Sequence, residues 1–176
     1  MFNSVRMSLK FLHLHLHGLI RSNNLELGRD SDTGGQTQYV LELVKSLANT
    51  SEVDQVDLVT RLISDSKVHN DYSKEEEFIE PGAKILRFQF GPNKYLRKEL
   101  LWPHLDELTN NLIKYYQKQE NNLTWIHAHY ADAGYVGVRL SKALKVPFIF
   151  TGHSLGREKK RKLLEADLKI NQIEKL

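Results

Sequence analysis

The sequence has no cysteine among its 176 residues. This absence excludes disulfide bonds and zinc sites with thiolate ligands, and it is typical of a reducing compartment. A chain of this length can bury a sizeable core without cross-links. We therefore expect one domain over residues 1–176, located in the cytoplasm.

Long hydrophobic runs are missing as well. Every apolar stretch is broken by His, Lys or Gly well before the roughly 20 residues that a membrane-spanning helix needs. Near the N-terminus, His13, His15 and His17 interrupt the leucines that would form the core of a signal peptide. We expect neither a membrane partner nor secretion.

A strong charge of one sign is also lacking, because 25 Lys and Arg face 22 Asp and Glu, for a net charge of +3. Much of the basic excess lies in the tract 157–162. A solvated helix face is the favoured interpretation of that tract, with an anion or nucleic-acid site as the alternative. No stacking motif of the RNA-binding kind accompanies it, so no nucleic-acid partner is expected.

Strand and helix patterns alternate along the chain. Apolar alternation predicts strands at 8–16, 53–60, 84–90, 123–128 and 146–150. Helical periodicity predicts helices at 34–48, 100–118 and 133–144, with a last helix from about residue 156, whereas 64–82 is a charged connection. This order indicates the α/β class, with a Rossmann-like, doubly wound parallel sheet.

Ligands of such sheets bind beyond the carboxyl ends of the strands. Three predicted strands lead there into loops that carry glycine and polar residues, at 18–36, 127–134 and 151–154. We expect these three loops to converge on one cleft.

The turn from Thr33 to Gln36 has the capping-box pattern. In this pattern the Thr side chain caps the backbone amide three residues later, and the Gln side chain reaches back to the amide of the Thr. A well-formed helix start explains it. Gly34 and Gly35 suggest more, because glycine costs about 1 kcal/mol relative to alanine within a helix. Two glycines in a first turn let a ligand approach bare amides, which favour a phosphate or another anion.

Two patterns resemble metal sites, but no metal is expected from either. Asp30 and Asp32 mimic an Asp-X-Asp motif, yet Asp32 precedes a helix and no further oxygen ligands lie nearby in the sequence. His13, His15 and His17 share one face of a strand, a spacing that can bind zinc. The favoured interpretation packs His13 and His15 beneath helices and leaves His17 at the strand end, where a substrate loop begins.

Two further side chains are placed to reach a ligand. His153 stands between a strand end and a helix start, where an imidazole can donate or accept a hydrogen bond. Lys98 belongs to a loop with three cations within five residues, which suits either solvation or capture of a sugar phosphate.

Six stretches in order along the chain resemble the N-terminal domain of the sucrose-phosphate synthases. They are His17-Gly18-Leu19-Ile20-Arg21, Leu27-Gly28-Arg29-Asp30-Ser31-Asp32-Thr33-Gly34-Gly35-Gln36, Phe90-Gly91-Pro92, Leu101-Trp102-Pro103-His104, His129-Tyr130-Ala131-Asp132-Ala133-Gly134 and Thr151-Gly152-His153-Ser154-Leu155-Gly156-Arg157. The resemblance implies a retaining glycosyltransferase of the GT-B arrangement, whose two Rossmann-like domains enclose the site. Such enzymes transfer glucose from UDP-glucose to fructose 6-phosphate and need no further cofactor.

The resemblance also implies residue roles. Gly34 and Gly35 would let amides approach the substrates, and Gln36 would touch the acceptor sugar. Lys98 would pair with the fructose phosphate, and Asp132 would bond acceptor hydroxyls.

His153, the predicted catalytic residue, would contact the donor glucose near the reacting carbon. His17 and Arg157 complete the predicted substrate-binding set. No protein nucleophile is expected, so positioning and charge stabilisation carry the chemistry.

The second, nucleotide-sugar domain of that family has no counterpart in the sequence. We therefore expect residues 1–176 to be inactive in transfer alone, and to expose an apolar docking surface that promotes self-association. A sucrose synthase that uses free fructose and a non-catalytic fragment that binds a sugar phosphate are the alternatives.

Overall fold

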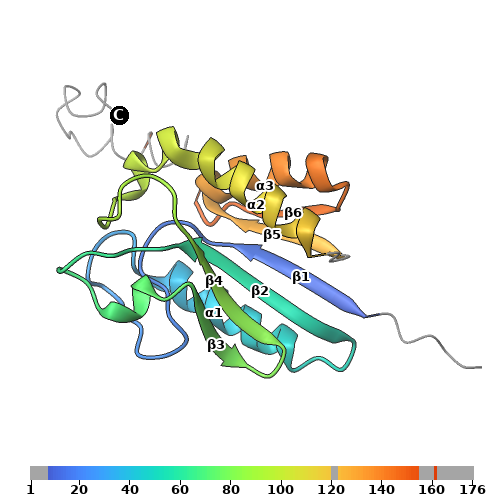
Figure 1. Cartoon of the computed structure of the whole chain (residues 1–176). Helices are drawn as coiled ribbons and strands as arrows, with labels where there is room; N and C mark the ends of the chain where they lie inside the picture. The colour runs from blue at the N-terminus through green and yellow to red at the C-terminus, as the bar shows by residue number, and fades with distance from the viewer. Residues whose placement is uncertain (1–7, 120–122, 155–160, 162–176) are drawn as a thin grey trace, which may run out of the picture.

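The computed structural model describes residues 8–119, 123–154 and 161. Its centre is a six-stranded sheet in the order β3-β4-β2-β1-β5-β6. Neighbouring strands are parallel except for β3, which runs antiparallel to β4. Figure 1 shows α1 on one face of the sheet and α2 and α3 on the other. The predicted α/β class with helices on both faces is confirmed.

The elements lie close to the predicted positions. The strands are β1 Leu9–Leu14, β2 Val53–Arg61, β3 Glu76–Glu80, β4 Ala83–Phe88, β5 Trp125–His129 and β6 Phe148–Thr151. The α-helices are α1 Gly35–Ala48, α2 Leu105–Lys118 and α3 Tyr130–Leu144, and the short 3₁₀ turns are η1 Asn70–Ser73, η2 Lys98–Leu100 and η3 Trp102–His104. None of the helices within these residues is long and apolar enough to cross a membrane.

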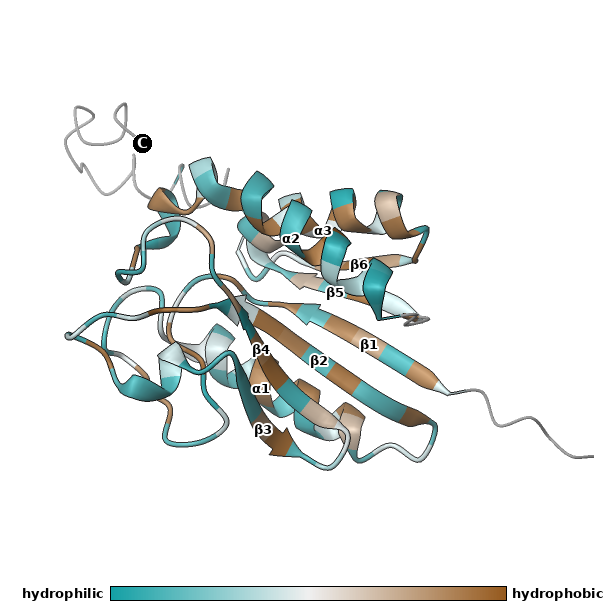
Figure 2. Cartoon of the chain, in the orientation of Figure 1, coloured by the Kyte–Doolittle hydropathy of each residue, from teal (hydrophilic) through white to brown (hydrophobic). Residues whose placement is uncertain are grey.

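Each face of the sheet has its own core, because alternate residues of a strand point to opposite faces. Leu12 and Leu14 of β1 pack with α2 and α3, whereas Phe11 packs with α1. Figure 2 shows hydrophobic central strands and helices on which hydrophobic and hydrophilic segments alternate. The two cores hold the sheet from both sides, so its strand ends provide a firm base for a site.

The strand order reverses between β1 and β5. The chain leaves β1 for α1 on one face, and it leaves β5 for α3 on the other. Loops that diverge in this way leave a crevice at the carboxyl edge of the sheet, the usual ligand position in doubly wound folds.

Strand β3 contradicts the expectation that residues 64–82 form only a connection and that the whole sheet is parallel. Its sequence, Glu-Glu-Phe-Ile-Glu, contains three carboxylates and lacks the alternation that predicts a half-buried strand. It lies at the edge of the sheet, where charged residues are common, and Phe78 is 69% exposed.

The second helix begins at Leu105 rather than at residue 100. The turns η2 and η3 precede it, and Pro103 lies within η3. Proline lacks the amide that a continuous helix would need and restricts the residue before it, so the chain turns before α2 starts. The helix expected from about residue 156 lies outside the described residues.

Candidate functional site

A cavity of about 400 Å³ opens at the carboxyl edge of the sheet. The three loops predicted to converge there all contribute to its wall, as does η2. The lining residues are His17, Ser31, Gly35, Gln36, Tyr39, Lys98, Tyr130, His153 and Ser154. The site therefore lies at the strand-order reversal between β1 and β5.

Gly18 lets the loop after β1 fold back against the sheet. Its φ is +74°, and a Cβ there would lie 2.3 Å from the carbonyl oxygen of Asp32. One residue further, the amide of Leu19 donates to Oγ1 of Thr33 at 3.1 Å. Together these contacts bring the Asp32 and Thr33 segment beside the end of β1.

The predicted capping box at Thr33 and Gln36 is wrong. The N-cap of α1 is Gly34, and no side chain caps the helix. Thr33 Oγ1 is engaged by the Leu19 amide, and Nε2 of Gln36 lies 3.1 Å from Nδ1 of His15. Tertiary contacts compete successfully for both side chains, so the first-turn amides of α1 lack side-chain caps.

The two glycines at the start of α1 have open space where a side chain would stand. A Cβ at Gly34 or Gly35 would meet no atom within 4 Å, and Gly35 lines the cavity. Amides of a first helical turn have no partner within the helix and attract anions. The approach of a ligand to this backbone stays a prediction.

Lys98 lies on the cavity wall and forms an ion pair with Asp32 through Nζ and Oδ1. The Lys98 amide also donates to Oδ2 of Asp32 at 2.8 Å. Burial alone would raise the pKa of the Asp32 carboxyl, but the hydrogen bonds from Lys98 lower it overall. Asp32 therefore anchors η2 to the loop before α1 and balances the charge of Lys98.

His17 and Asp132 form a buried pair at the ends of β1 and β5. Nδ1 of His17 lies 2.8 Å from Oδ2 of Asp132, whose Oδ1 accepts the amide of Ala133 at 2.7 Å. The Asp132 side chain is only 1% exposed, and this residue does not line the cavity. Asp132 lies behind His17, so its contact with the cavity is indirect.

Tyr130 and His153 reach the cavity from backbone positions with positive φ, at 77° and 53°. Such positions cost a non-glycine residue of order 1–3 kcal/mol and are common at functional sites. Burial and the nearby His17 lower the pKa of His153. Its imidazole is thus neutral at physiological pH and can both donate and accept hydrogen bonds.

His13 and His15 are buried, as predicted. His15 contacts Thr37 of α1 through Nε2 at 3.3 Å, and His13 contacts His129 through Nδ1 at 3.1 Å. The sequence interpretation singled out neither His127 nor His129. Their alternate spacing in β5 and the parallel pairing with β1 were the available signals that they share the face of His13.

The structure brings together five of the eight predicted site residues in one cavity wall: His17, Gly35, Gln36, Lys98 and His153. Gly34 is the N-cap of α1, directly before Gly35, and Asp132 lies behind His17. Arg157 lies outside the described residues. The roles of all eight stay predictions.

The cavity is chemically suited to a polar ligand with many hydroxyls. Imidazoles, two serine hydroxyls, an amide side chain and an ammonium line it, and Tyr39 and Tyr130 add aromatic surface. Such groups form hydrogen bonds with sugars and pack against their apolar faces.

Comparison with known proteins gives a consistent family. Residues 34–169 match the glycosyl transferase 4-like domain. A probable sucrose-phosphate synthase 2 and a sucrose-phosphate synthase 1, both from Arabidopsis thaliana, are each 44% identical to this chain over 86% of its residues. A sucrose-phosphate synthase structure from Thermosynechococcus elongatus superposes over 87% of the chain with a TM-score of 0.72 and 27% identity.

These likenesses confirm the resemblance drawn from the motifs and the expected fold, the N-terminal Rossmann-like half of a GT-B arrangement. The relatives are much longer. The chain spans 17% of each of the two Arabidopsis proteins and 35% of the Thermosynechococcus chain.

Proposed function

Because this chain belongs to the glycosyl transferase 4-like domain family, we propose that it forms the acceptor side of a sucrose-phosphate synthase site. The complete reaction would transfer glucose from UDP-glucose to fructose 6-phosphate with retention, giving sucrose 6-phosphate and UDP. UDP-glucose would be a co-substrate, and no cofactor would be needed. The cytoplasmic location stays a prediction.

One observation carries this proposal: the cavity at the strand-order reversal joins the start of α1 to His17 and His153. A phosphorylated sugar needs a polar wall for its hydroxyls and a positive end for its phosphate. The histidines offer the polar wall, and the uncapped amides of α1 together with Lys98 offer the positive end.

The ion pair between Lys98 and Asp32 refines the role of this lysine. A phosphate would share the ammonium with a carboxylate that is already bound, so Lys98 alone supplies little net charge. We propose that Lys98 fixes the position of the phosphate by hydrogen bonding, and that the helix dipole supplies part of the attraction. Arg157, the other predicted substrate-binding cation, lies outside the described residues, and its role stays a prediction.

Asp132 would act through His17. Its carboxylate accepts from Nδ1 and so holds the ring in one orientation, with Nε2 left for a substrate hydroxyl. His153 would stand near the transferred glucose. Because retention in this class requires no protein nucleophile, these groups would align the two substrates and stabilise charge in the transition state.

A second domain would close the cavity and hold most of the nucleotide sugar. Exposed apolar side chains in the cavity wall and in the turns η2 and η3 suit such a contact: Tyr39, which lines the cavity, is 49% exposed, Leu100 56% and Trp102 46%. We propose that residues 1–176 bind the acceptor but do not transfer glucose, and that this exposed surface promotes self-association.

Calorimetry on purified residues 1–176 tests the binding part of the proposal. Fructose 6-phosphate, fructose and inorganic phosphate would each be titrated, with the variant Lys98→Met measured beside the unmodified chain. We expect saturable binding of fructose 6-phosphate, tighter than fructose or phosphate alone, and weaker binding by the variant.

Two other results would redirect or overturn the proposal. Equal or tighter binding of free fructose would favour a sucrose synthase, and no binding of any sugar would remove the acceptor role. Release of UDP from UDP-glucose that depends on fructose 6-phosphate would show that the chain is active alone.

A further inference from the structure

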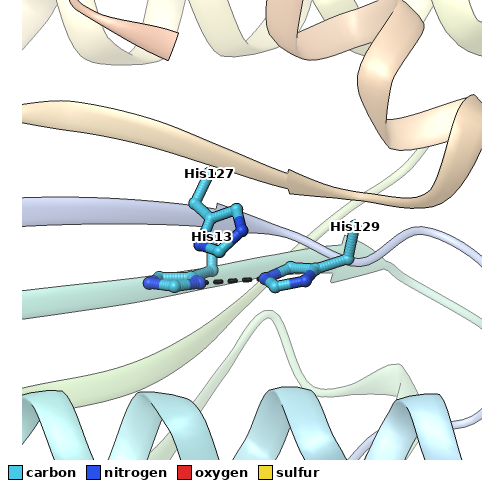
Figure 3. Close-up of side chains that lie close together, drawn as sticks. All are labelled: His13, His127 and His129. Carbon is cyan, nitrogen blue, oxygen red and sulfur yellow. Dashed lines mark hydrogen bonds between the residues drawn. The ribbon is translucent and has the colours of Figure 1, made fainter. Parts of the chain in front are cut away.

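Three histidine rings lie together beneath the sheet, outside the wall of the cavity. They come from two neighbouring strands: His13 from β1, and His127 and His129 from β5. One ring nitrogen of each lies within 4.8 Å of the corresponding nitrogens of the other two. Figure 3 shows the rings gathered on the face of the sheet that α1 covers.

This group differs from the metal pattern considered in the sequence. That pattern ran along one strand through His13, His15 and His17, whereas the structure joins residues more than a hundred positions apart. His15 and His17 are engaged elsewhere, with Thr37 and Asp132. Only His13 belongs to both sets.

The three rings are in the form that binds a metal. His13 and His129 are fully buried and His127 is half-buried. Burial, together with the charge of the neighbouring histidines, lowers the pKa of His13 to about 3 and that of His129 to about 2. Neutral imidazoles keep the lone pair that a metal requires.

Neighbouring groups fix two of the rings from behind. Nε2 of His127 lies 2.8 Å from Oγ1 of Thr151, and Nδ1 of His129 lies 3.1 Å from Nε2 of His153. Metal-binding histidines are ordinarily held through the second nitrogen in this manner. For His127 this leaves Nδ1 for a ligand, whereas Nε2 of His129 is hydrogen-bonded to His13.

His13 supplies the remaining evidence. Its Nδ1 and Nε2 of His129 are hydrogen-bonded at 3.1 Å, so one of the two carries the shared hydrogen; a metal ion would take the place of that hydrogen once it moves to the other nitrogen of its ring. That separation suits two ligands bound at about 2.0–2.1 Å from one zinc ion. Nε2 of His13 is buried and has no hydrogen-bond partner within the described residues, so only one of the two ring nitrogens, Nδ1, forms a hydrogen bond.

We propose that His13, His127 and His129 bind one Zn²⁺, with a fourth ligand from solvent. Among the described residues no carboxylate joins these three imidazoles, and such a set selects zinc or another late transition metal over Mg²⁺ or Ca²⁺, which prefer oxygen ligands. The ion would join β1 to β5 at the base of the cavity. Through His129 it would also fix His153 in the cavity wall.

The test is a titration of the untagged, chelator-treated chain with Zn²⁺, in which calorimetry measures the binding. A polyhistidine tag must be absent because it would bind zinc itself. We expect one Zn²⁺ per chain, a melting temperature that rises as zinc saturates the site, and a Co²⁺ complex whose visible spectrum indicates tetrahedral nitrogen coordination.

Two variants locate the site. His127→Gln should weaken zinc binding by at least about tenfold, the smallest loss ordinarily seen when even a group that supports a ligand is replaced. His69→Gln, at an exposed histidine far along the chain from the three rings, should bind zinc as tightly as the unmodified protein. If His127→Gln does not fold, Thr151→Val, which removes the partner of His127, provides the same comparison.

Absence of saturable zinc binding would overturn the proposal. So would equal affinity in the unmodified protein and a folded His127→Gln or Thr151→Val variant, or loss of binding in His69→Gln. None of these results bears on sugar binding, so the zinc site and the proposed function stand or fall separately.

Discussion

Asp132 holds His17 in a single orientation, with Oδ2 of the carboxylate 2.8 Å from Nδ1 of the ring. The two residues come from opposite ends of the described sequence and meet where β1 and β5 end. Because Nδ1 is the nitrogen that bonds the carboxylate, Nε2 is the one left for another partner. A residue that does not line the cavity thereby determines what a residue in its wall can bind.

Replacement of Asp132 by Asn should therefore affect both stability and binding. Loss of a buried, charge-assisted hydrogen bond should lower the free energy of urea unfolding by about 1.5–3 kcal/mol. The affinity for fructose 6-phosphate, measured by calorimetry, should also fall. Asp106→Asn is the control, because Asp106 is 72% exposed and bonds only at the surface; its change should stay within about 0.5 kcal/mol. Unchanged affinity in a folded Asp132→Asn variant would refute the positioning role.

Gly18 and Gly28 offer a matched pair of alanine substitutions. Both have positive φ, at +74° and +80°, so each variant should lose about 1–2 kcal/mol of stability from the backbone conformation. Only at Gly18 would the new Cβ also meet the Asp32 carbonyl, at 2.3 Å. Thermal unfolding should show Gly18→Ala to be clearly less stable than Gly28→Ala. Equal losses would mean that the close approach at Gly18 is unimportant.

Gly35→Ala separates a folding role from a binding role. A Cβ there meets no atom within 4 Å, and alanine favours helix, so stability should be unchanged or rise by up to about 1 kcal/mol. The new methyl group would enter the cavity wall and should weaken binding of fructose 6-phosphate in the same titration. Ser46→Ala, on the exposed side of α1, should improve the helix without any effect on binding. A Gly35→Ala variant that binds normally would favour a purely structural glycine.

Lys98→Met should be among the more destabilising changes in η2. It would leave the Asp32 carboxylate, 1% exposed, without its cation, and removal of one member of a buried pair costs about 3–5 kcal/mol. We expect the lower end of that range from urea unfolding, because the Lys98 side chain is 13% exposed. Lys94→Met, at an exposed lysine of the same loop, should change stability by less than about 0.5 kcal/mol.

The same pair predicts a pH dependence. The folded state lowers the pKa of Asp32 below 3.8, so near that pH the unfolded chain binds more protons. The stabilisation by Asp32 is thus present above the unfolded pKa and lost as the pH falls through the folded one. Between about pH 5 and 3 the unmodified protein should lose more unfolding free energy than the double variant Asp32→Asn, Lys98→Met. Parallel pH profiles would contradict this assignment.

Much of the fold could be predicted because the period of the apolar residues distinguishes strands from helices. The alternation of β1 placed His13 opposite Leu12 and Leu14, and the structure confirms those faces. Strand β3 was missed because it pairs at an edge and is stabilised by β4 rather than by its own pattern. The start of α2 was missed because the apolar pattern continues through residues 100–104, whereas Pro103, a local signal in the sequence, interrupts the helix there.

The site was predictable to a lesser degree. That strand-end loops converge follows from topology alone, and His17, Gly35 and His153 do meet in one cavity. Which partner each polar side chain selects does not follow from topology. Thr33 was expected to cap α1 and instead binds the Leu19 amide, because a contact 14 positions away competes with the local one. The pairing of Lys98 with Asp32, 66 positions apart, was equally hidden.

Strand β5 ends at His129 and α3 begins at Tyr130, with no residue between them. One wall of the cavity is therefore continuous with the sheet and cannot adjust without bending it. The part of the wall at η2 is attached through the ion pair of Lys98 with Asp32, and these two residues can change together without repacking either core. Changes of sugar preference during evolution should accumulate on the η2 side, while the β5 side stays constant across different acceptors.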